Sequence, residues 1–141
     1  MIIYFVCTGN TCRSPMAQAI AQQLNTELDL GYELHSRGIA VDEEAGAAFS
    51  AVEAAKKHDL DLSAHISRQL SDNDVERADV IYTMTAQQRD ILNTWYPKAV
   101  DKIKTLAPED IEDPFMQDDE VYMRTFAELS RAIGKTVCFL P

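Results

Sequence analysis

Apolar residues along this chain fall into two patterns, short continuous runs and longer stretches with a helical period. The run at residues 2–6 is wholly apolar, which is typical of a strand buried on both faces. Ser14 and Pro15 suit the N-cap and first turn of a helix, and Gly31 suits its end. Apolar residues recur at every fourth position between them: Met16, Ile20, Leu24 and Leu28. The sequence therefore predicts a strand followed directly by a helix.

The next segment repeats this order. Residues 32–36 predict a second strand, which Gly38 closes. Residues 46–58 are rich in alanine, with Phe49 and Val52 on one face. This composition and spacing predict a second helix.

The second half of the chain again places strands before helices. Residues 78–84 predict a third strand, and residues 85–88 (TAQQ) fit a capping box for a helix that Pro97 stops. The remaining predicted elements are a fourth strand at 102–106 and a last helix at about 119–133, with Val121, Thr125, Phe126 and Leu129 facing inward and Gly134 at its end.

Alternating strands and helices indicate right-handed crossovers and a parallel sheet covered on both faces. We therefore expect one α/β domain over residues 1–141, with a four-stranded parallel sheet between two layers of helices. Ligands in such folds bind where strands end and helices begin. The first such turn, at residues 7–14, is the expected site.

Composition narrows the range of partners. The 46% hydrophobic and 26% charged residues are those of a globular protein, and the net charge of −10 argues against a nucleic-acid partner. Seven acidic residues between 109 and 120 favour either a basic protein substrate or a solvated loop. The first apolar run is too short for a signal peptide, and no stretch is long enough to span a bilayer. We expect a cytoplasmic protein with no membrane partner.

Residues 7–14 read CTGNTCRS and carry the strongest chemical signal. Backbone N–H groups at the start of a helix form an anion site, and Gly9 permits a tight path there. Arg13 adds a planar fork of donors that matches two phosphate oxygens. The same donors would stabilise a thiolate at Cys7 as a nucleophile. A cysteine alone at the end of a strand is usually a core residue, and an arginine alone at the start of a helix is usually solvated. The pair across this turn favours catalysis.

At this loop the sequence resembles the low-molecular-weight protein-tyrosine-phosphatase family, which includes bacterial protein-arginine phosphatases. The resemblance rests on residues 6–17 and extends through residues 36–38 (SRG), 78–79 (AD) and 113–115 (DPF). It implies a four-stranded parallel sheet flanked by helices. It also implies a phosphoprotein phosphatase that forms a cysteinyl-phosphate, releases inorganic phosphate and uses no cofactor or metal.

The resemblance assigns roles to individual residues. Cys7 would be the nucleophile, Arg13 the phosphate clamp, and Ser14 a donor to the thiolate. The side chain of Asn10 would hold the shape of the loop. The other loop residues expected to contact substrate are Thr8, Gly9, Thr11 and Cys12, and the expected partners of Asn10 are Ser36 and His65.

Two of these residues keep alternative readings. His65 also fits a histidine of a surface loop. Cys12 fits either a small buried residue or a reversible disulfide partner of Cys7 that would protect it from overoxidation.

Asp113 is the candidate general acid, because loss of phosphate leaves a basic atom that must be protonated. Pro114 restricts Asp113 to extended geometry, and Phe115 can wall the pocket. An Asp-Pro turn is common elsewhere, so the catalytic assignment depends on the resemblance.

Thr11 favours phosphoarginine as the substrate. The resemblance implies a larger aliphatic residue at this position in tyrosine-specific relatives and Thr in arginine phosphatases. Acidic residues 42–44 would complement a cationic substrate, and the resemblance implies that Met116 stands where many tyrosine phosphatases have a second aromatic residue. Phosphotyrosine remains the alternative substrate, and Thr11 could also be a packing residue only.

Other interpretations of the sequence are weaker. Arsenate reductases resemble it but use a further mid-chain cysteine pair, and no cysteine lies between Cys12 and Cys138. A zinc site would need Cys7, Cys12 and a histidine, at a spacing not typical of zinc fingers. Residues 134–136 (GKT) resemble the end of a nucleotide P-loop, but the first glycine of that motif is absent. A non-catalytic phosphate-binding module is a further alternative for residues 7–14, but it would not need Asp113.

Overall fold

The computed structural model describes residues 1–140 and confirms a four-stranded parallel sheet. The strand order is β2-β1-β3-β4, with bounds β1 Ile2–Cys7, β2 Glu33–Gly38, β3 Val80–Thr83 and β4 Ile103–Thr105. The helices are α1 Arg13–Glu27, α2 Phe49–Lys56, α3 Asp72–Arg77, α4 Ala86–Trp95 and α5 Asp119–Thr136, with short 3₁₀ helices at Pro97–Lys102 and Val137–Phe139. No helix of residues 1–140 is both long and apolar enough to cross a membrane.

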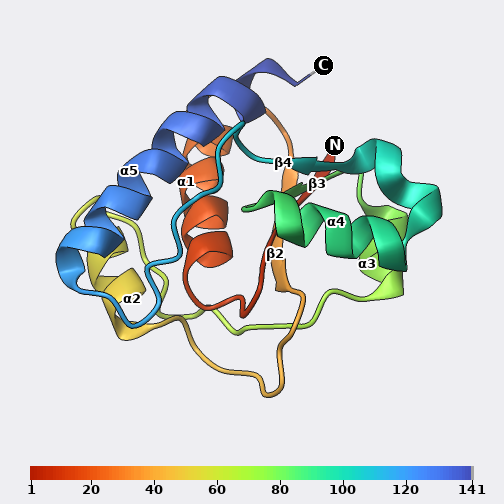
Figure 1. The fold of residues 1–141 in the computed structure, drawn as a ribbon. Coiled ribbons are helices and arrows are strands. Elements are labelled where there is room, and N and C mark those ends of the chain that lie inside the picture. Colours follow the sequence, from red (N-terminus) through yellow and green to blue (C-terminus); the bar gives the residue numbers. More distant parts are fainter. Residues whose placement is uncertain (141) are drawn as a thin grey trace.

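The helices form a layer on each face of the sheet (Figure 1), and β1 supplies side chains to both layers. Ile3, Phe5 and Cys7 pack with α1, α2 and α5, whereas Tyr4 and Val6 pack with α3 and α4. Residues 3–6 are fully buried. This accounts for the continuous apolar run at the start of the sequence, because both faces of the strand are covered.

Several predicted element ends are wrong for local reasons. Helix α1 begins at Arg13 with Cys12 at its N-cap, because the Ser14 hydroxyl bonds Cys7 and Asn10 instead of capping the helix. Helix α5 runs through Gly134 to Thr136. The chain also has a short helix, α3, that the sequence pattern did not predict, although it starts with a capping box at Ser71 and Asp74.

The predicted helix at residues 46–58 is shorter in the structure. It begins at Phe49, whose side chain is 78% exposed, and its buried face consists of Ala51, Ala54 and Ala55. Small alanine side chains let α2 approach α5 closely, so Phe49 is not needed in this interface.

The strand order creates a crevice beside the end of β1. From β1 the chain crosses to β2 on one side, and β3 lies on the other side. The loops after β1 and β3 therefore diverge, and such a switch point is where parallel sheets bind ligands. The loop at residues 7–14 begins at this point.

Gly38 lies where the backbone is too crowded for any side chain. A Cβ there would stand 2.5 Å from Val41 Cγ2 and 2.8 Å from the Thr8 carbonyl oxygen. We expect Gly38→Ala to lower the free energy of unfolding by about 1–3 kcal/mol, as overpacking does.

Urea titration measures this change, and Gly134→Ala is the matched control. No atom lies within 4 Å of a Cβ at Gly134, inside α5, so we expect that variant to gain about 0.5–1 kcal/mol. Equal effects of the two substitutions would show that crowding at Gly38 is relieved by movement of the loop.

Candidate active site

The loop after β1 forms one wall of a cavity of about 200 Å³. Eight residues line it, all of them candidates from the sequence: Cys7, Thr8, Gly9, Thr11, Cys12, Arg13, Asp113 and Phe115. The last two come from the loop between β4 and α5, about 100 residues further along the chain. The fold therefore brings the candidate nucleophile, clamp and acid to one cavity.

The Cys7 sulfur is surrounded by hydrogen-bond donors. The backbone N–H of Asn10 donates to Cys7 Sγ at 3.2 Å, and Ser14 Oγ lies 2.9 Å from the same atom. Asn10 Nδ2 donates to Ser14 Oγ at 2.7 Å. Because Ser14 Oγ accepts from Asn10, its own hydrogen can point to the sulfur or to the Arg37 carbonyl oxygen, which lies further away at 3.4 Å. This arrangement would stabilise a negative charge on Cys7.

Asn10 fixes the shape of the loop. Its backbone is left-handed, with φ of 56°, and its side chain is fully buried. Asn10 Nδ2 also donates to Ser36 Oγ at 3.1 Å, Asn10 Oδ1 accepts from the Arg68 N–H at 2.9 Å, and His65 Nε2 lies 2.8 Å from the Asn10 carbonyl oxygen. Ser36 and His65 thus lie where the sequence analysis placed them, as partners of Asn10.

Burial of His65 predicts that the stability of the protein depends on pH. Burial lowers the pKa of His65, and this outweighs the bond to the Asn10 carbonyl, which acts to raise it. Unfolded histidine titrates near a pKa of about 6.5. Below that pH the unfolded chain takes up a proton that the folded chain does not, so stability falls as pH falls from the unfolded pKa towards the folded one.

We expect wild type to lose more stability than His65→Gln between pH 7.5 and 5.5. The Gln amide does not titrate and can still donate to the Asn10 carbonyl. Urea titrations of both proteins at each pH give the comparison. Parallel loss of stability would mean that other groups govern the pH dependence.

Arg13 lies almost fully buried beside the sulfur. Its Nη1 donates to the Ile111 carbonyl at 3.1 Å, and its Nη2 lies 3.5 Å from Asp113 Oδ2. The carboxylate of Asp113 is 56% exposed. The guanidinium is therefore aimed across the cavity by two groups of the loop before α5.

The loop that carries Asp113 is anchored just before this residue, to the segment after β3 and to α5. Ile111 N–H donates to the Met84 carbonyl, and the Glu112 carboxylate accepts two bonds from Arg124 of α5 at 2.9 and 3.0 Å. Beyond these anchors, Phe115 and Met116 are 54% and 86% exposed. Asp113 thus directly follows two anchored residues, and of the two exposed apolar side chains after it Phe115 lines the cavity.

Sequence reasoning missed two side chains that hold the loop. The hydroxyl of Tyr122 in α5 lies 3.3 Å from Cys12 Sγ, and Gln88 Nε2 donates to Thr8 Oγ1 at 3.1 Å. Burial raises the pKa of the Cys12 thiol, and all three cysteines are free. The capping box at residues 85–88 was visible in the sequence, but nothing in it indicated that Gln88 reaches Thr8.

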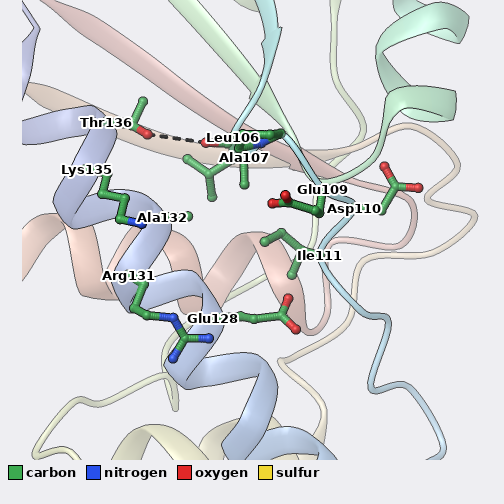
Figure 2. A pocket seen from close by; sticks show the side chains of 11 residues that line it. Leu106, Ala107, Glu109, Asp110, Ile111, Glu128, Arg131, Ala132, Lys135 and Thr136 are labelled. Carbon is green, nitrogen blue, oxygen red and sulfur yellow. Dashed lines mark hydrogen bonds between the residues drawn. The ribbon is translucent and has the colours of Figure 1, made fainter.

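A larger cavity, of about 330 Å³, lies between residues 106–111 and α5 (Figure 2). Charged side chains of both signs surround it, including Glu109, Glu128 and Arg131. None of the lining residues that the structure describes is a cysteine or a histidine, and the carbonyl of Ile111, which lines it, accepts from Arg13 of the smaller cavity. The reactive groups therefore belong to the smaller cavity.

The zinc alternative has no matching cluster. Within residues 1–140, no three His, Cys, Asp or Glu side chains are grouped to hold a metal ion. His35 bonds Glu33, His58 stacks on Phe126, and His65 bonds the Asn10 carbonyl. The three histidines are thus engaged away from the two cysteine sulfurs.

Comparison with known proteins agrees with this geometry. Residues 2–138 match the family described as low molecular weight phosphotyrosine protein phosphatase. The chain is 34% identical to a protein-arginine-phosphatase of Bacillus subtilis (strain 168), over 94% of this chain and 92% of that protein. It is also similar to the crystal structure of a low molecular weight protein tyrosine phosphatase from T. tengcongensis, with a TM-score of 0.95 and 38% identity over 99% of both chains.

A third comparison concerns the reacting residue. The chain matches a YwlE arginine phosphatase variant that carries a phosphorylated active-site serine, with a TM-score of 0.91 and 32% identity over 99% of this chain and 97% of that one. The chain therefore belongs to the low molecular weight phosphotyrosine protein phosphatase family and is an enzyme of the phosphatase class.

Proposed function

We propose that this protein removes phosphate from arginine side chains of proteins, with Cys7 as nucleophile, Arg13 as phosphate clamp and Asp113 as general acid. The observation that carries this proposal is the cavity that joins these three residues. Its floor is a cysteine sulfur facing the Asn10 N–H and the Ser14 hydroxyl. Its rim is formed by the polar side chains of Thr8 and Thr11.

In the first step, the Cys7 thiolate attacks phosphorus in line with the bond to the leaving group. Arg13 and the loop N–H groups hold the phosphoryl oxygens as charge shifts onto them. Asp113 gives its proton to the leaving nitrogen, and the arginine side chain departs as the P–N bond breaks and the S–P bond forms. Ser14 supports the thiolate through its 2.9 Å contact with Cys7.

In the second step, water attacks the cysteinyl-phosphate. The Asp113 carboxylate left by the first step takes a proton from this water, and the sulfur leaves as thiolate. The products are inorganic phosphate and the starting enzyme. The protein thus contributes a positioned nucleophile and an acid that alternates between two protonation states.

The residues at the rim support arginine over tyrosine. Two threonine hydroxyls can bond guanidinium N–H groups, and they narrow the apolar slot a phenyl ring would need. The −10 net charge suits a cationic protein segment rather than a nucleic acid. The Bacillus subtilis relative is named an arginine phosphatase, whereas the T. tengcongensis relative, of similar identity, is named a tyrosine phosphatase. Overall identity therefore does not choose between them.

Phosphotyrosine is the second candidate because of Phe115. This ring lines the cavity and is 54% exposed, so it could contact a substrate ring. The Phe115 ring favours phosphotyrosine, whereas Thr8 and Thr11 disfavour it. We expect the effect of the two threonines to be the larger.

Initial rates on matched phosphoarginine and phosphotyrosine peptides, measured in EDTA with reductant, test the proposal. We expect the higher kcat/KM with phosphoarginine, and we expect Thr11→Ile to reverse or reduce that preference. A faster wild-type reaction with phosphotyrosine would contradict the arginine assignment. Relative rates that Thr11→Ile leaves unchanged would remove Thr11 from the argument.

A further inference from the structure

The side chain of Gln88 is a buried polar group that the mechanism above leaves without a role. It lies in the first turn of α4 and is 4% exposed. Its Oε1 accepts from the Met84 N–H at 2.9 Å and from the Thr85 N–H at 3.1 Å. These two donors fix the orientation of the amide, because a flipped group would place N–H against N–H. The Nε2 atom must therefore face the other way.

That other direction leads to the candidate site. Gln88 Nε2 donates to Thr8 Oγ1 at 3.1 Å, across the crevice between the loops after β1 and β3. Thr8 directly follows Cys7, and its carbonyl accepts from the Ala40 N–H at 3.0 Å. Both the backbone and the side chain of Thr8 are thus held. The hydroxyl oxygen keeps one further lone pair, and its residue is exposed at the cavity rim.

The helix alone does not explain why this residue is Gln. A capping box accepts either Glu or Gln at its third position, because it needs only an acceptor. Glu would lack the N–H that holds Thr8, and it would place a negative charge beside a site for phosphate. The donor to Thr8 is the property that separates Gln88 from a residue that only caps α4.

We propose that Gln88 is a positioning residue for substrate selection, which holds the Thr8 hydroxyl where its free lone pair accepts an N–H of a phosphoguanidinium group. An aryl phosphate has no N–H to offer, so the held hydroxyl favours the guanidinium substrate. This inference rests on the proposed function, since it assigns part of the preference for phosphoarginine to one hydrogen bond.

The test compares ratios of kcat/KM, phosphoarginine peptide over p-nitrophenyl phosphate, in the full-length protein. We expect Thr8→Val to lower this ratio about three- to tenfold, the value of one hydrogen bond. We expect Gln88→Met to lower it in the same direction, and Thr8→Val with Gln88→Met to lower it no further than Thr8→Val alone.

The matched control for loss of the helix cap is Thr85→Ala. The Thr85 hydroxyl accepts from the Gln88 N–H in the same capping box but does not contact Thr8. We expect Thr85→Ala to weaken α4 and leave the ratio unchanged.

Three outcomes would overturn the inference. The first is an equal shift of the ratio by Gln88→Met and Thr85→Ala, and the second is a shift by Gln88→Met that persists when residue 8 is Val. The third is an unchanged ratio in Thr8→Val, which decides the matter even if Gln88→Met does not fold. If the wild type instead prefers phosphotyrosine peptides, the proposed substrate is wrong. The change in the kcat/KM ratio between the variants would still measure the coupling of Gln88 to Thr8.

Discussion

Replacement of Cys7 by serine should lower kcat by several orders of magnitude while leaving phosphate binding largely intact. Loss of an enzyme nucleophile costs about 10⁶-fold in the best-studied case. In the proposed mechanism the Ser14 hydroxyl and the Asn10 N–H, which face the Cys7 sulfur, support an attacking thiolate, but serine stays protonated at neutral pH. Arg13 and the loop N–H groups, to which we assign phosphate binding, are unchanged by this substitution.

Two measurements separate loss of chemistry from loss of binding. Single-turnover rates on a phosphoarginine peptide give the first, and calorimetric titration with inorganic phosphate gives the second. Cys138→Ser is the control, because Cys138 lies in the last 3₁₀ helix, away from the cavity. Turnover at the wild-type rate by Cys7→Ser would refute the whole mechanism.

Asp113→Asn has the second-largest expected effect, a fall in kcat of about 10²- to 10⁴-fold on phosphoarginine. The amide can neither donate the proton that the leaving nitrogen requires nor take one from the attacking water. We expect a smaller fall of kcat/KM on p-nitrophenyl phosphate, because p-nitrophenolate is a weak base that departs without protonation. Rates on both substrates, measured with the same enzyme preparation, give the comparison.

Asp119→Asn is the matched control for the loss of one charge. Asp119 stands in the first turn of α5, outside the cavity. We expect its rates to stay near those of wild type. Equal losses of kcat/KM on both substrates in Asp113→Asn would indicate that Asp113 orients Arg13, 3.5 Å away, and is not the acid, because kcat/KM excludes the hydrolysis step that both substrates share.

The sheet and the loop after β1 could be predicted because their signals are local. The apolar run at residues 2–6 identifies a strand covered on both faces, and CTGNTCRS places a thiol and a guanidinium at its end. The pairing of Asn10 with Ser36 and His65 came from a family resemblance. No spacing along the chain brings residues 26 and 55 positions apart to the same amide.

What the sequence did not indicate depends on tertiary contacts. The Ser14 hydroxyl fits an N-cap by residue type, and only the family resemblance indicated its contact with Cys7; its hydrogen bond from Asn10 was not foreseen. Gln88 fits a capping box, and the box is present, but its second hydrogen bond reaches a residue 80 positions away. Phe49 fits a helix face and stays exposed because alanines already fill the contact with α5.

The burial of β1 also has a consequence for how the site comes apart. Cys7 ends a central strand whose residues 3–6 have no exposed surface, whereas Asp113 stands on a loop with little regular structure. Amide hydrogens of β1 should then exchange only on global unfolding, and those near Asp113 through small local openings. A protease acting on the native protein should cut near residues 115–118 first. Under the proposed mechanism, the cut protein would keep Cys7 in place and lose the placement of Asp113, so it would be trapped with phosphate bound covalently to sulfur.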